Sequence, residues 1–516
     1  MANKTLFQSM RGAMVRAADA LNDEHAPAYA FDAKHELAQF AVTGCLSNTF
    51  YCNASGQLAR ALDLATRVDA GFIARTAVYA REHGAMKDMP ALLLAVLSVK
   101  DPALLRKVFG RVIDNGRMLR TFVQILRSGV AGRKSLGSAP KALVREWLAN
   151  ASERKLLDAA VGADPSLKDV VCMVHPKPAD RMREAFYGWL LGREYALDAL
   201  PVKLQEFLVY KVDRTQPVPD VPFQMLTALG LGRAEWTAIA RQAPWQMLRM
   251  NLNTFARHGV FEEKGLAERV AAKLRDREAI RKARALPYQL LAAYVTAANV
   301  PAIVRDALQD AMEIALENVP AFAGRVAVCP DVSGSMSSAV TGHRRGATSA
   351  VRCIDVAALM AAAVLRTNRD AVVLPFEQCV RELELNPRDS VMTNARTLAS
   401  IGGGGTNCSS PLRWMNQRRV SADLVILVSD NESWVDANKR GATETMRQWT
   451  EFKVRNPAAK LVCIDVQPNS TTQAQERDDV MNVGGFSDEV FGIVGAFASG
   501  ELARGHWTAK IEEIEL

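Results

Sequence analysis

The stretch most suggestive of chemistry is DVSGSM, residues 331–336, which gathers one carboxylate and two hydroxyls around a glycine. It directly follows RVAVC, an alternating apolar run that predicts a strand. Two later stretches carry similar oxygen side chains. Thr406 lies in the glycine-rich GGGGTNCSSP, and Asp430 lies in VSDNES after another apolar run. Carboxylates and hydroxyls without histidine or cysteine suit a hard divalent cation.

These side chains predict one metal site, and the candidate ligands are Asp331, Ser333, Ser335, Thr406 and Asp430. Mg²⁺ fits such a set better than Ca²⁺, because Mg²⁺ keeps several waters and accepts few protein ligands. So sparse a site leaves a coordination position that a carboxylate from a partner could fill. The alternative is a polar turn cluster that holds no metal.

No pattern in the sequence predicts an enzyme. DVSGSM is not the GxSxG turn of a serine nucleophile, and His506 lies near the end of the chain in a predicted final helix or tail. The glycines at 402–405 lack the lysine of a phosphate-binding loop, and GRKS at 132–135 lacks the required first glycine. We therefore expect a binding protein, with catalysis as an alternative.

Strand and helix patterns alternate after residue 320 and would position the candidate ligands. Strands are predicted at 325–329, 370–376, 422–430 and 460–466. Helical segments separate them, so the domain 321–516 is predicted to be a doubly wound α/β sheet. In such sheets ligands gather at the carboxyl ends of strands, near the point where strand order reverses.

The domain 1–320 instead follows the helical period, from about residue 30 to 318. In DPALLRKVFGRVI, 101–113, Asp101 is a predicted N-cap and Pro102 the first helical residue. A second amphipathic helix is predicted to end at Gly129. So many short helices predict a solenoid of HEAT-like pairs. A globular all-helical domain is the alternative, since no self-similar motif is found.

The net charge of +8 is unevenly distributed. Residues 321–516 hold 21 Lys and Arg against 23 Asp and Glu, whereas residues 1–320 hold 43 against 33, a net charge of +10. A basic helical part suggests a polyanionic partner. A solvated basic surface explains the charge equally well.

Cysteine spacing and hydropathy suggest a cellular location. The eight cysteines form no CxxC pair, which favours buried thiols in a reducing compartment. The longest apolar runs are too short to cross a bilayer, and the first thirty residues lack the apolar core of a signal peptide. We expect an ordinary first helix there, with a transit peptide as the alternative. We predict a cytoplasmic monomer without membrane association.

A helical array followed by DVSGSM, GGGGTNCSSPLRW and VSDNESW resembles the Ro autoantigen family, whose members carry a TROVE domain and a von Willebrand factor A domain. The DxSxS spacing with a later Thr and Asp is similar to the metal-ion-dependent adhesion site of A domains. VHPKP (174–178), ALPYQLLAAY (285–294) and DDVMNVGGFSDEVFGIVGAF (478–497) narrow the resemblance to Ro. It covers residues from about 30 to 500.

The resemblance implies a ring of helical repeats closed by the A domain. It also implies binding of small noncoding RNA of the Y type on a basic outer face, and capture of misfolded RNAs whose single-stranded ends enter the central hole. Bacterial relatives cooperate with exoribonucleases, so such a nuclease is a possible partner in RNA maturation or decay.

Candidate RNA contacts follow from the matching segments. They are Arg133, Lys134, Lys141, Arg145, Lys168, His175 and Lys177. His175, in the HxKP turn that the family associates with Y RNA, is the strongest single candidate. That histidine could instead only pack or cap a helix, and each cation could be a solvated charge.

A different class of function uses the A domain alone. The chain would then be a metal-dependent protein-interaction module whose helices only present that domain. RNA that co-purifies with the chain favours RNA binding, whereas metal-dependent capture of a protein without RNA favours the interaction module. Turnover lost on changing Asp331 would be needed for an enzyme.

Overall fold

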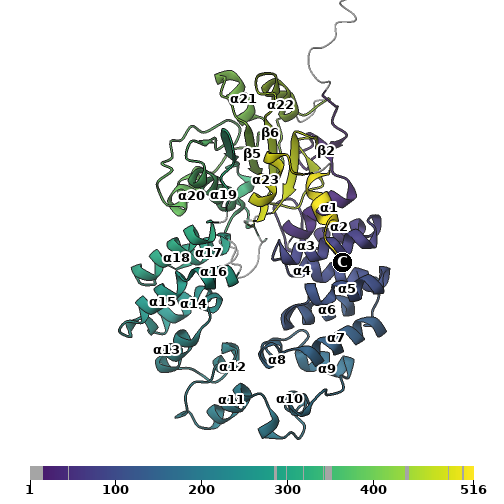
Figure 1. Cartoon of the computed structure of the whole chain (residues 1–516), viewed down its shortest axis with the longest axis vertical. Helices are drawn as coiled ribbons and strands as arrows, with labels where there is room; N and C mark the ends of the chain where they lie inside the picture. The colour runs from purple at the N-terminus through teal and green to yellow at the C-terminus, as the bar shows by residue number, and fades with distance from the viewer. Residues whose placement is uncertain are drawn as a thin grey trace, which may run out of the picture. The chain divides into compact units, whose positions relative to one another are not determined.

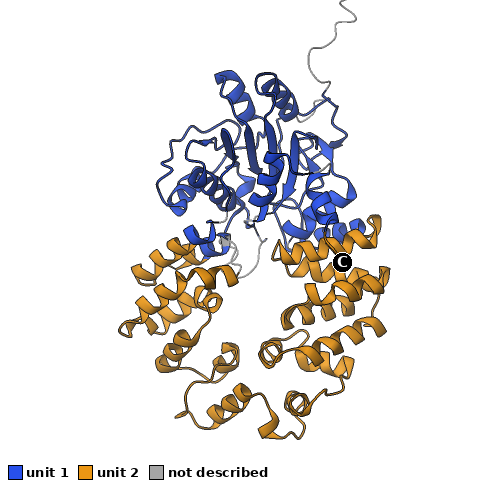
Figure 2. Cartoon of the chain, viewed as in Figure 1, with its two compact units in different colours: residues 1–64, 286–292, 312–513 blue, residues 65–285, 293–311, 514–516 orange. Residues whose placement is uncertain are grey.

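The computed structural model describes residues 15–44, 46–283, 287–297, 299–317, 319–340, 342, 351–435, 441–485, 487, 489–502 and 505–516. The chain forms two compact units (Figure 2). Unit 1 comprises residues 1–64, 286–292 and 312–513, and unit 2 comprises 65–285, 293–311 and 514–516. These units divide the chain differently from the domains 1–320 and 321–516, which as separately folding domains stay a prediction.

Five parallel strands form the main sheet of unit 1, in the order β4-β3-β5-β6-β8 (Figure 1). They are β3 (Val326–Pro330), β4 (Val372–Val373), β5 (Leu424–Ser429), β6 (Lys460–Asp465) and β8 (Val480–Gly484). Every residue of β3, β5 and β8 is buried, which explains their continuous apolar sequences. The chain runs from β3 to β4 on one side and then to β5 on the other, so strand order reverses between β3 and β5.

Helices cover both faces of this sheet. They are α19 (Cys353–Thr367), α20 (Val391–Ala399), α21 (Ser410–Arg418), α22 (Glu444–Arg455), α23 (Glu489–Ser499) and α24 (His506–Glu512). One core cluster joins alternate residues of β3, β5 and β6 to Met415 of α21 and to Trp449 and Phe452 of α22. Helix α19 packs against β3 and β5. The predicted doubly wound α/β class is confirmed.

The N-terminal segment adds to unit 1 as strands. β1 (Ala20–Leu21) pairs with β2 (Pro27–Ala30), which pairs antiparallel with β7 (Thr471–Thr472). The helix expected here is wrong for residues 15–30, and residues 1–14 lie outside the described part. A free edge at β7 offers backbone hydrogen bonds, whereas Pro27 inside a helix would remove one.

Helix α1 (Ala33–Thr43) follows these strands, begins at the N-cap Asp32 and packs beside β8 and α24. Helix α2 (Ala54–Arg67) comes next in the chain.

Unit 2 is built from stacked helix pairs. Its first helices are α3 (Ala70–Glu82), α4 (Asp88–Lys100), α5 (Pro102–Val112), α6 (Gly116–Ser128), α7 (Ser138–Asn150), α8 (Glu153–Ala160) and α9 (Leu167–Val174). From α3 to α7, each helix packs against the one two places further along. Such contacts with near neighbours are typical of solenoid repeats.

The remaining helices continue the helical part. They are α10 (Arg181–Leu191), α11 (Val202–Val212), α12 (Phe223–Thr227), α13 (Arg233–Gln242), α14 (Trp245–Arg257), α15 (Leu266–Leu274), α16 (Arg277–Ala283), α17 (Pro287–Thr296) and α18 (Ala302–Ala315). The predicted helical class is confirmed, while closure of the repeats into a ring and the HEAT assignment stay predictions.

Local predictions in this unit hold in detail. Asp101 caps α5, and its carboxylate accepts the backbone N–H of Ala103 and of Leu104 at 3.0 Å each. Gly129 ends α6 with a φ of 84°, a conformation that glycine adopts without strain. None of the helices among the described residues is long and apolar enough to cross a membrane. The seven described cysteines are free thiols.

Candidate functional site

Two of the candidate metal ligands follow neighbouring strands at the point where strand order reverses. Asp331 comes directly after β3, and Asp430 directly after β5. The backbone N–H of Asp331 donates to the carbonyl of Val428 at 2.9 Å, which ties the two strand ends together. The side chains of Asp331 and Asp430 are 0% and 2% exposed. The sheet topology therefore puts two buried carboxylates at its ligand-binding edge.

The two serines follow Asp331 in the same turn. Asp331 Oδ1 accepts the backbone N–H of Ser333 at 2.8 Å, and the hydroxyls of Ser333 and Ser335 lie 3.3 Å apart. A short 3₁₀ helix, Ser335–Ser337, follows, and the Ser335 side chain lies close enough to Asp430 to act on the pKa of that carboxylate. The structure thus brings four of the five predicted ligands to one edge of the sheet.

Thr406, the fifth candidate, lies in a loop that is fixed on two sides. The N–H of Gly334 donates to the carbonyl of Gly404 at 2.9 Å, which joins this loop to the loop of Asp331. The N–H of Trp434 donates to the carbonyl of Thr406 at 3.3 Å, which joins it to the loop of Asp430. Thr406 is buried. Backbone hydrogen bonds therefore hold all three loops of the candidate centre together.

The glycines of this loop allow the close approach. Gly404 has a φ of 77°, and a Cβ atom there would lie 1.8 Å from Glu377 Oε2. A Cβ on Gly405 would lie 2.2 Å from the indole nitrogen of Trp434. Side chains at either position would clash, so glycine is required for packing here.

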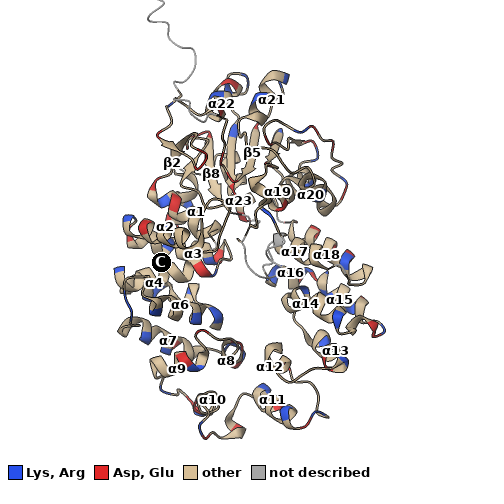
Figure 3. Cartoon of the chain, turned by 180° about the vertical axis from the view of Figure 1, so that it is seen from behind, with Lys and Arg blue, Asp and Glu red and all other residues tan. Residues whose placement is uncertain are grey.

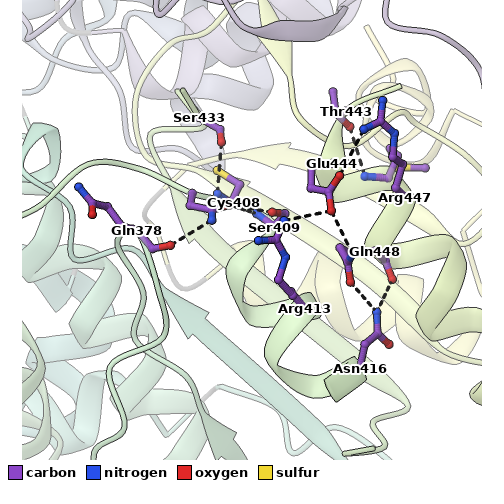
Figure 4. A network of polar contacts seen from close by, with 12 residues as sticks. Gln378, Cys408, Ser409, Arg413, Asn416, Ser433, Thr443, Glu444, Arg447 and Gln448 are labelled. Atoms are coloured by element: carbon purple, nitrogen blue, oxygen red, sulfur yellow. Dashed lines mark hydrogen bonds and ion pairs between the residues drawn. The ribbon is translucent and has the colours of Figure 1, made fainter. Parts of the chain in front are cut away.

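A polar network fixes the helix that follows the loop (Figure 4). The carboxylate of Glu444 on α22 accepts from Arg413 of α21 at 3.1 Å and from Gln448 at 3.0 Å. Asn416 of α21 donates to the side-chain oxygen of Gln448 at 3.0 Å. The helix α21 is therefore clamped to α22, and the loop that precedes it has a fixed end.

The electrostatics of the centre favour a cation. Burial raises the pKa of Asp331 to about 6, with a smaller contribution from the charge of Glu377. Burial raises the pKa of Asp430 to about 7, with a contribution from the charge of Asp331. Neither aspartate forms an ion pair with a basic side chain among the described residues. Buried carboxylates without a cation are unfavourable, so a divalent ion fits this donor set.

The site also contains residues that the sequence reasoning missed. The Ser429 hydroxyl donates to Asp331 Oδ2 at 2.5 Å, and Asp465, at the end of β6, accepts from Gln39 of α1 at 2.7 Å. Ser429 and Asp465 end strands, so the rule used for Asp430 could have found them. Gln39 and Glu377 carry no such signal.

The candidate metal centre contains few acidic side chains. Among the described residues, no group of three or more histidine, cysteine, aspartate or glutamate side chains could hold a metal ion. A metal at this centre would therefore depend on hydroxyl ligands as well as on the two aspartates.

The candidate RNA contacts lie on α7, α9 and the adjoining loops of unit 2. Arg133 donates to the carbonyl of Ser98 at 2.9 Å, and Arg145 to the carbonyl of Val174 at 2.5 Å. Both guanidinium groups are therefore partly engaged within the fold. Arg145 is nevertheless exposed, as are Lys134, Lys168, His175 and Lys177, whereas Arg133 and Lys141 are half-buried.

His175 occupies a distinctive backbone position. It is the C-cap of α9, with a φ of 49°, and its N–H donates to the carbonyl of Val171 at 2.9 Å. The bond from Arg145 to Val174 holds the residue just before it. The structure thus presents an exposed imidazole at a fixed helix end and brings Arg145 to the same end.

A row of cations along α6, extended by Lys87 at the N-cap of α4, was missed. We call Lys87 together with Arg117, Arg120 and Arg127 of α6 the α6 strip; Figure 3 shows Lys and Arg on α6. Partial burial lowers the pKa of Lys87, and the charges of Arg117 and Arg81 lower it further. Burial and the charge of Arg117 lower the pKa of Arg120. None of the four forms an ion pair with a described residue.

The α6 strip extends toward Lys168, which is one of the predicted RNA contacts. Both Arg127 and Lys168 act on the carboxylate of Asp169 at the start of α9. The i, i+3 and i+10 spacing of Arg117, Arg120 and Arg127, opposite the apolar face of α6, was visible in the sequence.

Comparisons with known proteins agree on one family. Residues 325–498 match the family model of the Ro60 vWA domain. The chain is 26% identical over 520 residues to the RNA-binding protein RO60 of Deinococcus radiodurans, covering 92% of this chain and 94% of that one. It is 24% identical over 271 residues to the RNA-binding protein RO60 of Caenorhabditis elegans, covering 50% of this chain and 41% of that one.

A solved structure shares the fold. The crystal structure of the Deinococcus radiodurans RO (RSR) protein matches with a TM-score of 0.61 at 22% identity, covering 91% of this chain and all of that one. The resemblance seen in the sequence is therefore confirmed: this chain is similar to Ro proteins over nearly its whole length, and its residues 325–498 match the model of the Ro60 vWA domain.

Proposed function

We propose that this protein binds small noncoding RNA of the Y type, together with misfolded RNAs or RNAs that carry a free 3′ end. It would act as a cytoplasmic, monomeric scaffold in RNA quality control, maturation or decay, with an exoribonuclease as a partner. The α6 strip is the observation that carries the proposal, because its cations gather without ion-pair partners among the residues that the structure describes. The names of both RO60 relatives, which call them RNA-binding proteins, support it.

The strip suits a phosphate backbone. Arg117 and Arg127 are ten residues apart on α6, about 15 Å along the helix at 1.5 Å per residue. A single RNA strand laid along that length can place several phosphates near guanidinium groups. Arg and Lys contacts to phosphate position RNA without reading its sequence, and they make affinity depend on salt.

The salt dependence of binding tests this surface. Changing Arg117, Arg127 and Lys168 together to Gln should make the slope of log affinity against log salt shallower by about 2–3, at roughly 0.7–0.9 per lost phosphate contact. The matched control changes Lys203, Arg233 and Arg241 to Gln, since each of these exposed cations already pairs with a glutamate. Equal slopes for both triple variants would locate the RNA elsewhere.

The same titration tests the predicted loop before α7. Changing Arg133, Lys134 and Lys141 together to Gln should also make the slope shallower by roughly 2–3 if each contacts a phosphate. Because Arg133 already donates to Ser98, its single variant should contribute less to that change than Lys134. An unchanged slope in this triple variant would mean that these charges only solvate the surface.

The metal centre supports a second candidate function. We propose that Asp331, Ser333, Ser335, Thr406 and Asp430 hold one Mg²⁺, whose charge would fix an anionic ligand at the sheet edge. Two buried carboxylates without a basic partner favour this. Mg²⁺-dependent capture of a protein that survives ribonuclease treatment would support an interaction module. Capture that disappears with the RNA would favour the RNA scaffold.

A further inference from the structure

The exposed face of α5 combines cations with a glycine in the body of the helix. The opposite face is apolar and buried, and it consists of Leu105, Val108, Phe109 and Val112. The exposed face carries Ala103, Arg106, Lys107, Gly110 and Arg111. This face therefore has two residues with little or no side chain, and long basic side chains stand beside them.

Packing does not explain the glycine. A Cβ atom at Gly110 would meet no atom within 4 Å, whereas a Cβ at Gly404 or Gly405 would clash. Glycine lowers the stability of a helix relative to alanine, and alanine would fit here without strain. What glycine provides at this position is a stretch of helix backbone that a ligand can approach closely.

The cations beside Gly110 are available to such a ligand. Arg106 and Lys107 precede Gly110 by four and three residues, so their side chains border it on the helix surface. Neither forms an ion pair or a side-chain hydrogen bond with a described residue. Arg111, by contrast, is engaged by Glu82 through hydrogen bonds of 2.7 and 2.8 Å. The ligand suited to this surface is therefore an anion that lies along Arg106, Lys107 and Gly110.

The neighbouring helix α7 continues the surface. It packs beside α5 (Figure 1), and the indole of Trp147 donates to the carbonyl of Ile113 at the end of α5 at 3.0 Å. On α7 the exposed Ala142 again lies next to cations, here Lys141 and Arg145. We call Arg106, Lys107, Gly110, Lys141 and Arg145 the α5–α7 face.

The composition of this face favours a nucleic acid over a protein. The sequence of α5 contains no acidic residue, and that of α7 contains only Glu146. None of the large hydrophobic side chains that are exposed among the described residues lies on α5 or α7. A protein partner would therefore lack the apolar anchors that dominate protein interfaces, whereas phosphates need only cations and room.

We infer that the sugar–phosphate backbone of a bound RNA crosses α5 at Gly110, between Arg106 and Lys107, and continues toward Lys141 and Arg145 of α7. The inference rests on the proposed RNA binding and extends it to α5, from which no contact was predicted. The absent side chain of Gly110 would then be as important for RNA affinity as the charges beside it.

Adding a side chain at Gly110 tests the close approach. In the full chain, Gly110→Ala should weaken binding of a fluorescent RNA hairpin with a single-stranded 3′ tail about fivefold, the value of roughly one hydrogen bond. Gly110→Gln covers more of the backbone without adding charge and should weaken binding at least about tenfold, as expected for hydrogen bonds to a charged group. Gly110→Ala should at the same time raise Tm by about 1–4 °C, because alanine favours the helix.

This combination of results separates the inference from a folding defect. A variant that is more stable and yet binds RNA more weakly cannot owe its weaker binding to unfolding. A lower Tm for Gly110→Ala would show that the added methyl group does not fit, and would overturn the inference.

The chain offers a matched control on α23. Gly492 is also an exposed helical glycine whose Cβ would meet no atom within 4 Å, but α23 has no lysine or arginine. Gly492→Ala should raise Tm by a similar amount and leave RNA affinity unchanged. RNA affinities that are equal in both Gly110 variants, in Gly492→Ala and in the wild type would overturn the inference.

The salt dependence of binding tests the two cations. Changing Arg106 and Lys107 together to Gln should make the slope of log affinity against log salt shallower by about 1–2, at roughly 0.7–0.9 per lost phosphate contact. An unchanged slope would show that these charges only solvate the helix, and would overturn the inference. If the wild type binds no RNA, the proposed function fails as well; if it binds RNA and the α5 variants bind equally, only the inference fails.

Discussion

The metal centre of unit 1 holds buried acidic side chains, whereas the α6 strip of unit 2 holds basic side chains on the surface. Asp331 and Asp430 are buried beside other acids, whereas Arg117 and Arg127 are exposed cations on a helix surface. In both places like charges gather without an ion-pair partner among the described residues. Such clusters are unfavourable unless a ligand of opposite charge binds, so the same physical feature indicates a small cation in one unit and a polyanion in the other.

Burial makes the two sites differ in how they can be disturbed. A single substitution of a buried carboxylate removes its contribution to metal binding, because no other side chain can take its place. In the exposed strip several cations contribute to RNA affinity. Removing one of them has a small effect on affinity, and the effect grows with the number of charges removed.

The largest expected effect tests whether the two sites act independently. Asp331→Ala should weaken Mn²⁺ binding at least 100-fold, because it removes a buried ligand that has no substitute, while RNA affinity stays within a few-fold. Metal titration and filter binding at fixed salt measure the two quantities. A loss of two orders of magnitude in RNA affinity, in a folded variant, would make the A domain part of the RNA site.

A smaller effect comes from another group that unit 1 buries. His35 stacks on Phe31 with ring centroids 4.2 Å apart, and burial lowers its pKa to about 4; the charge of His506 adds to this and that of Asp32 opposes it. Between pH 6.5 and 4 the unfolded chain binds a proton that the folded chain does not. Stability should therefore fall with falling pH, by about 2 kcal/mol from pH 7 to pH 5.

Urea unfolding of the wild type and of His35→Phe at both pH values measures this contribution. The comparison is needed because the raised pKa values of Asp331 and Asp430 act in the opposite sense: the metal-free folded state binds their protons first, and its stability rises as pH falls from 7 to 4. If His35→Phe loses as much stability on acidification as the wild type, His35 is not responsible.

The smallest expected effect concerns the fixed helix end of unit 2. His175→Ala should weaken binding of a structured Y-type RNA by about 3–10-fold, the value of roughly one hydrogen bond, with little change in salt slope at pH 8. A contact made through a hydrogen bond alone releases no counterion. A slope that becomes shallower by about one would show instead that His175 binds phosphate as a cation.

Sequence patterns predicted those features that depend on near neighbours. The apolar run of β3 and the oxygen residues after it were sufficient to place Asp331 at a strand end, and Asp101 was recognisable as the cap of α5. The ends of β3 and β5 were then expected to lie together, because in such sheets ligands gather at the carboxyl ends of strands where strand order reverses.

Contacts between distant parts of the chain were not predictable in this way. Asn22 donates to the carbonyl of Ser433 across 411 residues, and no local pattern near either residue points to that contact. The strand β2 likewise depends on a partner, β7, that lies far along the chain, so its own short sequence misled the helix prediction.

The pairing of β2 with β7 has a consequence for synthesis. On a ribosome, residues near position 30 would wait for residues near 472, about 20–90 s at 5–20 residues per second. The stacked helices of unit 2 depend on near neighbours and can form as they emerge. The nascent chain would therefore carry an N-terminal strand whose edge toward β7 is unpaired for most of its synthesis, a period in which a chaperone or a second nascent chain could pair with that edge.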